Sequence, residues 1–241
     1  MAKPISPLPT TLRRPTGPPT PRVPQLLMRV WDVPTRLFHW TTVLLVIISY
    51  VAAKMEWDKA HFYSGYSILT LLLFRIGWGF VGSETSRFSQ FLRSPLEGLR
   101  HLASFGGKRM PDTEIGHNAA GGWMVMALLG TLLLQVTTGL FAGDDSGALG
   151  PLGYHLSKAT GIKVGSVHVF TFNVILGLTS LHILAIGAYA IFKRHDLVRP
   201  MVTGKKRLPA TLRQPRFASP ILALAVLAVS AAAVAALVRF G

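Results

Sequence analysis

Five long apolar segments constrain this chain more than any other feature of its sequence. They span 37–53, 61–82, 119–142, 165–192 and 219–238, and Arg75 is the single Lys, Arg, Asp or Glu within them. About 20 mainly apolar residues cross a bilayer as a helix. In lipid each segment must be helical, because only hydrogen bonds within the segment satisfy its backbone. We therefore predict an all-α integral membrane protein.

The composition agrees with a membrane location and excludes several classes of function. Hydrophobic residues make up 50% of the 241 residues and charged residues 15%, whereas about a quarter of a soluble domain is charged. The net charge is +15, and the residues that carry it lie almost entirely in the connections between the apolar segments. We therefore expect no nucleic-acid partner. The chain has no Cys, which excludes disulfides, iron–sulfur centres and covalent c-type haem.

Lys and Arg are distributed unequally between the two sides of the predicted membrane protein. The first 36 residues carry six, residues 83–116 carry five and residues 193–216 carry eight, which makes 19 on one side. The other side carries five: Lys54, Lys59, Lys158, Lys163 and Arg239. The positive-inside rule places the 19 in the cytoplasm. We therefore expect a cytoplasmic N-terminus and a periplasmic C-terminus.

The chain divides into three parts. Residues 1–28 hold eight of the 16 Pro and lack the apolar core of a signal peptide, so we predict a disordered cytoplasmic arm. Residues 29–207 form a four-helix domain, and residues 208–241 form a linker and a fifth transmembrane helix. We also expect a short interfacial helix within 88–105 and a Gly-rich outer loop at 143–165.

Four of the eight His lie within or at the edge of the apolar segments: His39, His61, His168 and His182. Ionisable residues at this depth are costly and mark functional sites. His168 and His182 are fourteen residues apart, so they share a helix face about 21 Å apart along its axis. Their depths pair His61 with His168 near the outer side, and His39 with His182 near the cytoplasmic side.

Two imidazoles from different helices are the axial ligands that a six-coordinate b-type haem needs. Zinc fits less well, because two His leave its usual four positions underfilled and no Asp or Glu is buried nearby. We therefore predict two non-covalent haem b groups, whose iron ligands are the four histidines. One haem near each face would carry electrons across the membrane.

Three further residues are candidates for binding the cofactors. Arg75 lies fourteen residues after His61 on one helix face, where it either pairs with a propionate of the inner haem or extends to the lipid headgroups. Arg36 has the same two interpretations. His117, before the third segment, either contacts a propionate or a quinone headgroup or is a solvated helix-end residue.

The remaining histidines carry less information. His155 is the alternative ligand for the outer pair, and we expect His101 and His195 to be solvated in basic segments. The chain has no phosphate-binding loop, dinucleotide fingerprint, H-E-x-x-H motif or nucleophile elbow. Hydrolysis and phosphoryl transfer are therefore not expected.

A family resemblance is carried by four stretches: RVWDVPTRLFHW (29–40), HFYSGYSILTLLLFRIGWGFVG (61–82), GHNAAGGWMV (116–125) and RHDLVRPMVTGKK (194–206). Together with the spacing of His168 and His182, they resemble the bacterial cytochrome b561 and nickel-iron hydrogenase b-type cytochrome group. The resemblance covers 29–207 and implies a four-helix diheme core with the same four ligands. The Pro-rich arm and the fifth segment depart from that pattern.

The resemblance implies a subunit that passes electrons between a membrane quinone pool and an external redox partner, rather than a stand-alone catalyst. We expect that partner to be a periplasmic hydrogenase-like enzyme or a c-type cytochrome, with a quinone as a further candidate ligand. Two alternatives remain open: a self-contained quinone reductase for a small reductant such as superoxide, and a transporter or anchor without haem. Helix 219–238 would offer a surface for a larger complex.

Overall fold

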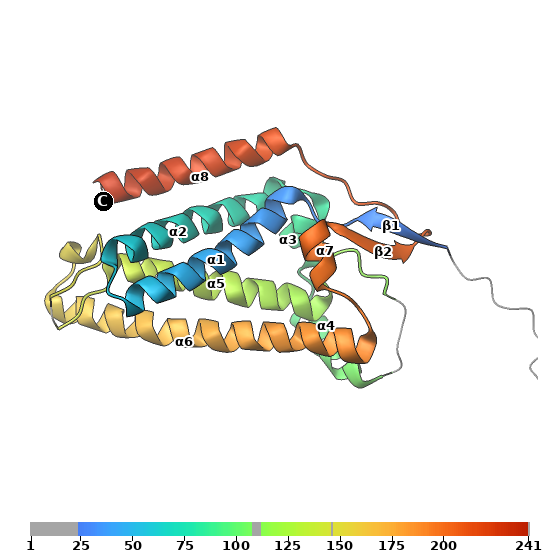
Figure 1. Cartoon of the computed structure of the whole chain (residues 1–241), viewed down its shortest axis with the longest axis horizontal. Helices are drawn as coiled ribbons and strands as arrows, with labels where there is room; N and C mark the ends of the chain where they lie inside the picture. The colour runs from blue at the N-terminus through green and yellow to red at the C-terminus, as the bar shows by residue number, and fades with distance from the viewer. Residues whose placement is uncertain (1–23, 108–111, 146, 241) are drawn as a thin grey trace, which may run out of the picture.

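The computed structural model describes residues 24–107, 112–145 and 147–240, and five long helices lie side by side in it (Figure 1). They are α1 (Val33–Lys54), α2 (Asp58–Val81), α5 (Ala119–Phe141), α6 (Lys158–Ala188) and α8 (Pro220–Phe240). Each is long and apolar enough to cross a membrane. The predicted all-α membrane fold is confirmed.

α2 is the central helix of the bundle. It packs against α1, α5 and α8, and α6 packs chiefly against α5. Ile68 and Leu72 of α2 are buried with Leu129 of α5 in the middle of this arrangement. α8 lies along α2 outside the other four helices (Figure 1), where Ala223 packs with Trp78. The architecture is therefore a four-helix bundle with a fifth helix added at its side.

α6 begins earlier than its apolar segment predicts, and the last residues of that segment form a π-helical turn. It begins at Lys158 because Ser157 caps it, accepting a hydrogen bond from the backbone N–H of Thr160. The outer loop expected at 143–165 is therefore shorter, and it contains a 3₁₀ turn, η3 (Gly153–His155). At the other end α6 continues as a π-helical turn, η4 (Tyr189–Lys193).

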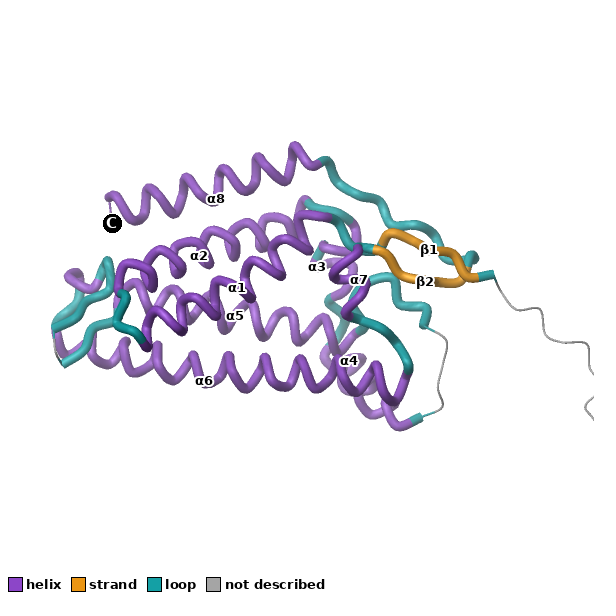
Figure 2. Tube along the Cα trace, viewed as in Figure 1, coloured by secondary structure: helices purple, strands orange, loops and turns teal. Residues whose placement is uncertain are grey.

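Short elements gather at one end of the bundle (Figure 2). The α2–α5 connection contains two short helices, α3 (Phe88–Phe91) and α4 (Pro95–Ala103), which bear out the helix expected there. Two 3₁₀ turns flank these helices, η1 (Glu84–Ser86) and η2 (Ser104–Gly106). A further short helix, α7 (Val198–Thr203), follows α6.

Two strands at this end correct the predicted arm. β1 (Gln25–Arg29) pairs antiparallel with β2 (Lys205–Pro209). The disorder predicted to residue 28 is therefore wrong for residues 25–28, because Met28 is buried with Leu208 and the two backbones satisfy each other's hydrogen bonds. Residues 1–23 of the predicted arm lie outside the described residues.

The connections alternate between the two ends of the bundle. The sheet, the α2–α5 connection and the α6–α8 connection lie at one end (Figure 1). The α1–α2 turn, the α5–α6 connection and the end of α8 lie at the other. Within the described residues, the Lys and Arg assigned to the more basic side therefore gather at the end that carries the sheet.

Candidate functional site

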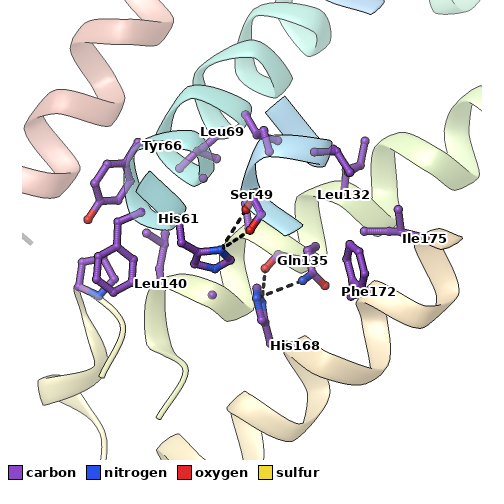
Figure 3. A pocket seen from close by; sticks show the side chains of 17 residues that line it. Ser49, His61, Tyr66, Leu69, Leu132, Gln135, Leu140, His168, Phe172 and Ile175 are labelled. Atoms are coloured by element: carbon purple, nitrogen blue, oxygen red, sulfur yellow. Dashed lines mark hydrogen bonds between the residues drawn. The ribbon is translucent and has the colours of Figure 1, made fainter. Parts of the chain in front are cut away.

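The outer histidine pair comes together between two helices. His61 lies in the first turns of α2 and His168 lies on α6, and their ring centroids are 6.2 Å apart with the ring planes at 85°. Figure 3 shows the two rings pointing toward each other. The structure thus brings together the two residues that their membrane depth had paired.

Two backbone carbonyls determine which ring nitrogen of each histidine carries the proton. Nδ1 of His61 is 3.0 Å from the carbonyl oxygen of Ser49 on α1, and Nδ1 of His168 is 2.9 Å from that of Gln135 on α5 (Figure 3). A carbonyl only accepts, so each Nδ1–H is the donor and each Nε2 keeps its lone pair. This is the arrangement that orients metal-binding histidines in proteins.

The pair lies beside a small cavity of about 70 Å³ that is partly open to the surroundings. Gly139 allows His168 its position, because a Cβ at residue 139 would lie 2.8 Å from Cε1 of the ring. Most of the other walls are apolar and include Val46, Leu132, Phe172 and Ile175.

The donor set fits a metal held by two imidazoles. Two metal–nitrogen bonds of about 2 Å, with a ring beyond each, separate the centroids by roughly 6 Å, close to the observed 6.2 Å. The described residues contain no group of three or more His, Asp or Glu placed to hold a metal ion. Haem iron needs two axial ligands from the protein, since the porphyrin supplies the other four.

Gln135 occupies the side of His168 on which a metal would bind. Its Nε2 donates a hydrogen bond to Nε2 of His168 at 3.1 Å, and its Oε1 is buried without a partner among the described residues (Figure 3). Rotation of the amide would release the histidine lone pair. A metal held by His168 therefore requires this amide to turn away.

The inner histidines gather with two other predicted residues. The pKa of His117 is lowered to about 3, first by burial and then by the neighbouring Arg75, His182 and His39. The ring of His117 packs against Trp31, at 4.8 Å between centroids. The interpretation of His117 as a solvated helix-end residue is therefore wrong, because the residue is neutral and packed inside this group.

Unpartnered polar atoms mark the same region. Within the part of the chain that the structure describes, Nδ1 of His39, Nδ1 of His117 and Nη1 of Arg75 are buried without a hydrogen-bond partner. Buried polar groups of this kind call for a ligand or water. The inner group therefore offers imidazole nitrogens for a metal and a guanidinium for an anion.

Arg75 and Arg36 both turn toward the protein rather than the lipid headgroups. Arg75 is 3% exposed and its guanidinium carbon lies 5.1 Å from the ring centre of Phe88. Nε of Arg36 is buried, and its Nη1 lies close to the left-handed turn at Gly204. The headgroup alternative is therefore wrong for Arg75, because α2 is covered by α3 at this level.

The other histidines are placed as follows. His155 stacks on Tyr154, with ring centroids 4.2 Å apart, and it does not line the cavity of the outer pair. His101 and His195 are half-buried rather than solvated, because the α2–α5 connection covers the end of α6 and brings Nε2 of His101 to 2.6 Å from the hydroxyl of Tyr189.

Sequence reasoning missed a buried carboxylate next to the inner group. Asp32 is 2% exposed and accepts hydrogen bonds from the backbone N–H of Thr35, Nε1 of Trp78 and the hydroxyl of Ser86. It caps α1, and Pro at the first turn of that helix is the accompanying signal. This capping pattern was visible in the sequence.

Comparison with known proteins gives one match. The family model described as Prokaryotic cytochrome b561 matches residues 30–204, which include the four-helix bundle and exclude α8. Comparisons with curated proteins and with solved structures found no match. The matched region covers more than half of the chain and contains all four membrane-depth histidines. The chain therefore belongs to the prokaryotic cytochrome b561 family.

Proposed function

We propose that this chain is a diheme b-type cytochrome that carries electrons across the cytoplasmic membrane between a quinone pool and a periplasmic redox protein. Membership of its family implies a membrane b-type cytochrome in transmembrane electron transfer. The observation that carries the finer proposal is the His61–His168 pair, whose 6.2 Å separation suits two axial ligands on one metal.

The outer haem would be held by Nε2 of His61 and Nε2 of His168. The carbonyls of Ser49 and Gln135 hold both rings in the tautomer that leaves Nε2 free. The mostly apolar walls of the cavity would limit contact of water with a bound macrocycle, which is one of the ways a protein tunes a haem. Bound haem iron supplies one-electron transfer.

The inner haem would be held by His39 and His182. Arg75 is placed to pair with a propionate, since its Nη1 is buried and unpartnered in the described part of the chain. His117 stays neutral at physiological pH and would donate one hydrogen bond to the same group. Arg36, closer to the sheet, is a further candidate for a propionate.

The two sites would lie at different depths of the membrane. His168 and His182 belong to one unbroken helix, on which fourteen residues span about 21 Å. We assign the end with the sheet to the cytoplasm, because 19 of the 25 Lys and Arg belong to that side. Electrons would then pass between an outer and an inner haem.

The outer end would exchange electrons with a hydrogenase-like enzyme or a c-type cytochrome, and a quinone would exchange them within the membrane. The outward face of α8 would pack on a further subunit of a larger complex. The alternative, a self-contained quinone reductase for a small reductant such as superoxide, differs from this proposal in needing no protein partner. The purified protein alone would then reduce quinone with that reductant.

The first test is the haem content of detergent-purified protein, measured as pyridine haemochrome with a reduced-minus-oxidised spectrum. We expect close to two haems per chain. His168→Ala should lose one of them, whereas Ser49→Ala should keep both, because the acceptor for His61 is the backbone carbonyl of Ser49. A colourless protein, expressed with sufficient haem, would overturn the proposal and favour a transporter or anchor.

A further inference from the structure

A second cavity lies at the sheet end of the bundle, away from the outer histidine pair. It has a volume of about 390 Å³ and is partly open to solvent, and its walls come from α4, the segment before α5 and the end of α6. Three titratable aromatic side chains face it: His101, Tyr189 and His195. None of these residues belongs to the proposed ligand set.

The hydroxyl of Tyr189 joins two hydrogen bonds inside this cavity wall. It lies 2.6 Å from Nε2 of His101 and 3.1 Å from Nδ2 of Asn118. The amide of Asn118 donates to the hydroxyl, and the hydroxyl donates to Nε2 of His101 in the neutral tautomer that carries its proton on Nδ1. Both distances are within the range over which protons transfer.

The backbone makes an unusual turn to hold Tyr189 in this place. Tyr189 is the first residue of the π-helical turn η4, and Arg194 closes the turn in the left-handed conformation with φ 57°. π-helical turns are rare and are frequent at functional sites. The turn also brings Lys193 to the backbone carbonyl of Gly107, at 3.1 Å, on the connection to α5.

Charged groups of both signs face the cavity or brace its wall. Nζ of Lys206 on β2 donates to Asp112 and to the backbone carbonyl of Glu114, each at 2.8 Å. The titratable groups around Tyr189 come from four parts of the chain. His101 lies on α4, and Asp112 and Glu114 lie before α5. Lys193 ends η4, His195 follows it, and Lys206 lies on β2. The two acids, Asp112 and Glu114, and the two bases, Lys193 and Lys206, are equal in number around this cavity.

This cluster lies next to the proposed inner haem site. Tyr189 follows His182 by seven residues, which places it about 10 Å further along the same helix face. Asn118 is adjacent to His117, which lies with His182 and His39. Charges at this separation inside a protein still interact, because they are screened less there than in water.

We propose that Tyr189 and His101 form a proton-exchange site coupled to the inner haem; the inference rests on the proposed function. When one electron arrives at the inner site, one proton from water in the cavity binds to Nε2 of His101, and the hydrogen bond to Tyr189 reverses its direction. When the electron leaves, the proton returns to water. Because linkage is reciprocal, protonation of His101 raises the reduction potential of the inner site.

The test is a redox titration of the full-length holoprotein, repeated from about pH 5.5 to about pH 8.5, the range in which histidine titrates. We expect two potentials, one of which falls with rising pH toward a limit of about 59 mV per tenfold change in proton concentration. Reduction should also take up protons, measured with a pH indicator dye.

Two variants test the two residues separately. Tyr189→Phe keeps the ring and removes the hydroxyl, and His101→Gln keeps a polar side chain and removes the titratable group. His101→Gln should lose most of the pH slope and of the proton uptake. Tyr189→Phe keeps the titratable ring but removes its hydrogen-bond partner, so its slope should move to a different pH. Both variants should keep two haems. Tyr154→Phe is the matched control, because it makes the same change at the opposite end of the molecule.

The outcomes separate the two proposals. If the wild-type protein holds two haems and neither potential depends on pH, the proton-exchange site is overturned and the electron-transfer function stands. The same conclusion follows if His101→Gln retains the full slope, or if Tyr189→Phe shows the same pH dependence as the wild type. If the purified protein holds no haem, the proposed function is overturned, and the proton-exchange site with it.

Discussion

Single hydrogen bonds to the backbone set the chemistry of the outer histidine pair. The acceptors for the two Nδ1–H groups are the carbonyls of Ser49 and Gln135, on two different neighbouring helices. Substituting these side chains leaves the carbonyls in place. The orientation of His61 and His168 therefore depends on helix positions, and a residue that shifts a helix or a ring should matter more than the acceptor residues themselves.

Gly139 is such a residue, and Gly139→Ala should weaken the outer haem site. A Cβ there would lie 2.8 Å from Cε1 and 3.2 Å from Nδ1 of His168, so the ring must move and its bond to Gln135 must lengthen. Loss of such an orienting bond costs about 10-fold to 100-fold in metal affinity. Haem titration of the purified variant measures the change.

Gly130→Ala is the control on the same helix. No atom of the described residues lies within 4 Å of a Cβ at Gly130, and Ala favours helix over Gly. This variant should bind two haems with unchanged affinity. Equal haem affinity in the two variants would contradict the proposed packing of Gly139 against His168.

At the scale of elements, α8 is attached through a compact set of contacts at its N-terminal side. The backbone N–H of Arg216 and the guanidinium of Arg213 both donate to the carboxylate of Glu84, and the hydroxyl of Ser83 accepts from the backbone N–H of Ala218. The hydrogen bond from Arg216, and then the contact with Arg213, lowers the pKa of Glu84. Residues 83–84 thus tie the linker to the end of α2.

Glu84→Gln should loosen this linker. The contribution of the carboxylate is at most about 1 kcal/mol, since the Arg213 partner is largely exposed. Because the folded pKa is lowered, this stability is fully present above the unfolded pKa of about 4.3 and is lost as pH falls through the folded pKa. Thermal unfolding should therefore separate variant and wild type at pH 7 and converge at low pH.

Limited trypsin digestion gives a second measurement of the same prediction. Cleavage after Arg213 and Arg216 should be faster in Glu84→Gln than in wild type, because the linker opens more often. Glu97→Gln, on the exposed face of α4, is the matched control and should behave as wild type. A pH-independent difference in stability would show that the charge of Glu84 is not what holds the linker.

At the scale of the whole molecule, charge distinguishes the two ends of the bundle. The described Lys and Arg of the more basic side gather around the sheet and the short helices, and the opposite end carries few. The membrane potential and anionic lipids retain such a basic end in the cytoplasm. The proposed orientation follows from this asymmetry.

The orientation is testable with single cysteines, because the chain has none of its own. Asp145→Cys lies in the α5–α6 connection and Glu97→Cys lies on α4, both at exposed positions at opposite ends. A membrane-impermeant maleimide should label Asp145→Cys in intact spheroplasts and label Glu97→Cys only after permeabilisation. The reverse pattern would invert the assignment of the outer and inner haems.

The features that the sequence determined by itself are those that depend on distance along the chain. Segment length and composition predict the five helices, since the hydrogen bonds of a transmembrane helix are local. Helical rise and residue spacing predict that His61 meets His168, and the structure agrees. Capping by Asp32 was predictable for the same reason, because its partner Thr35 is three residues away.

The tertiary structure decided what depends on contacts between distant segments. His168 finds its acceptor 33 residues away, and His101 finds Tyr189 at 88 residues. β1 pairs with β2 near the other end of the chain, which orders residues predicted to be disordered. Packing of the connections around α2 and α6 likewise buried Arg75 and His117. Local sequence carries no record of such contacts, because each depends on where the neighbouring helix lies.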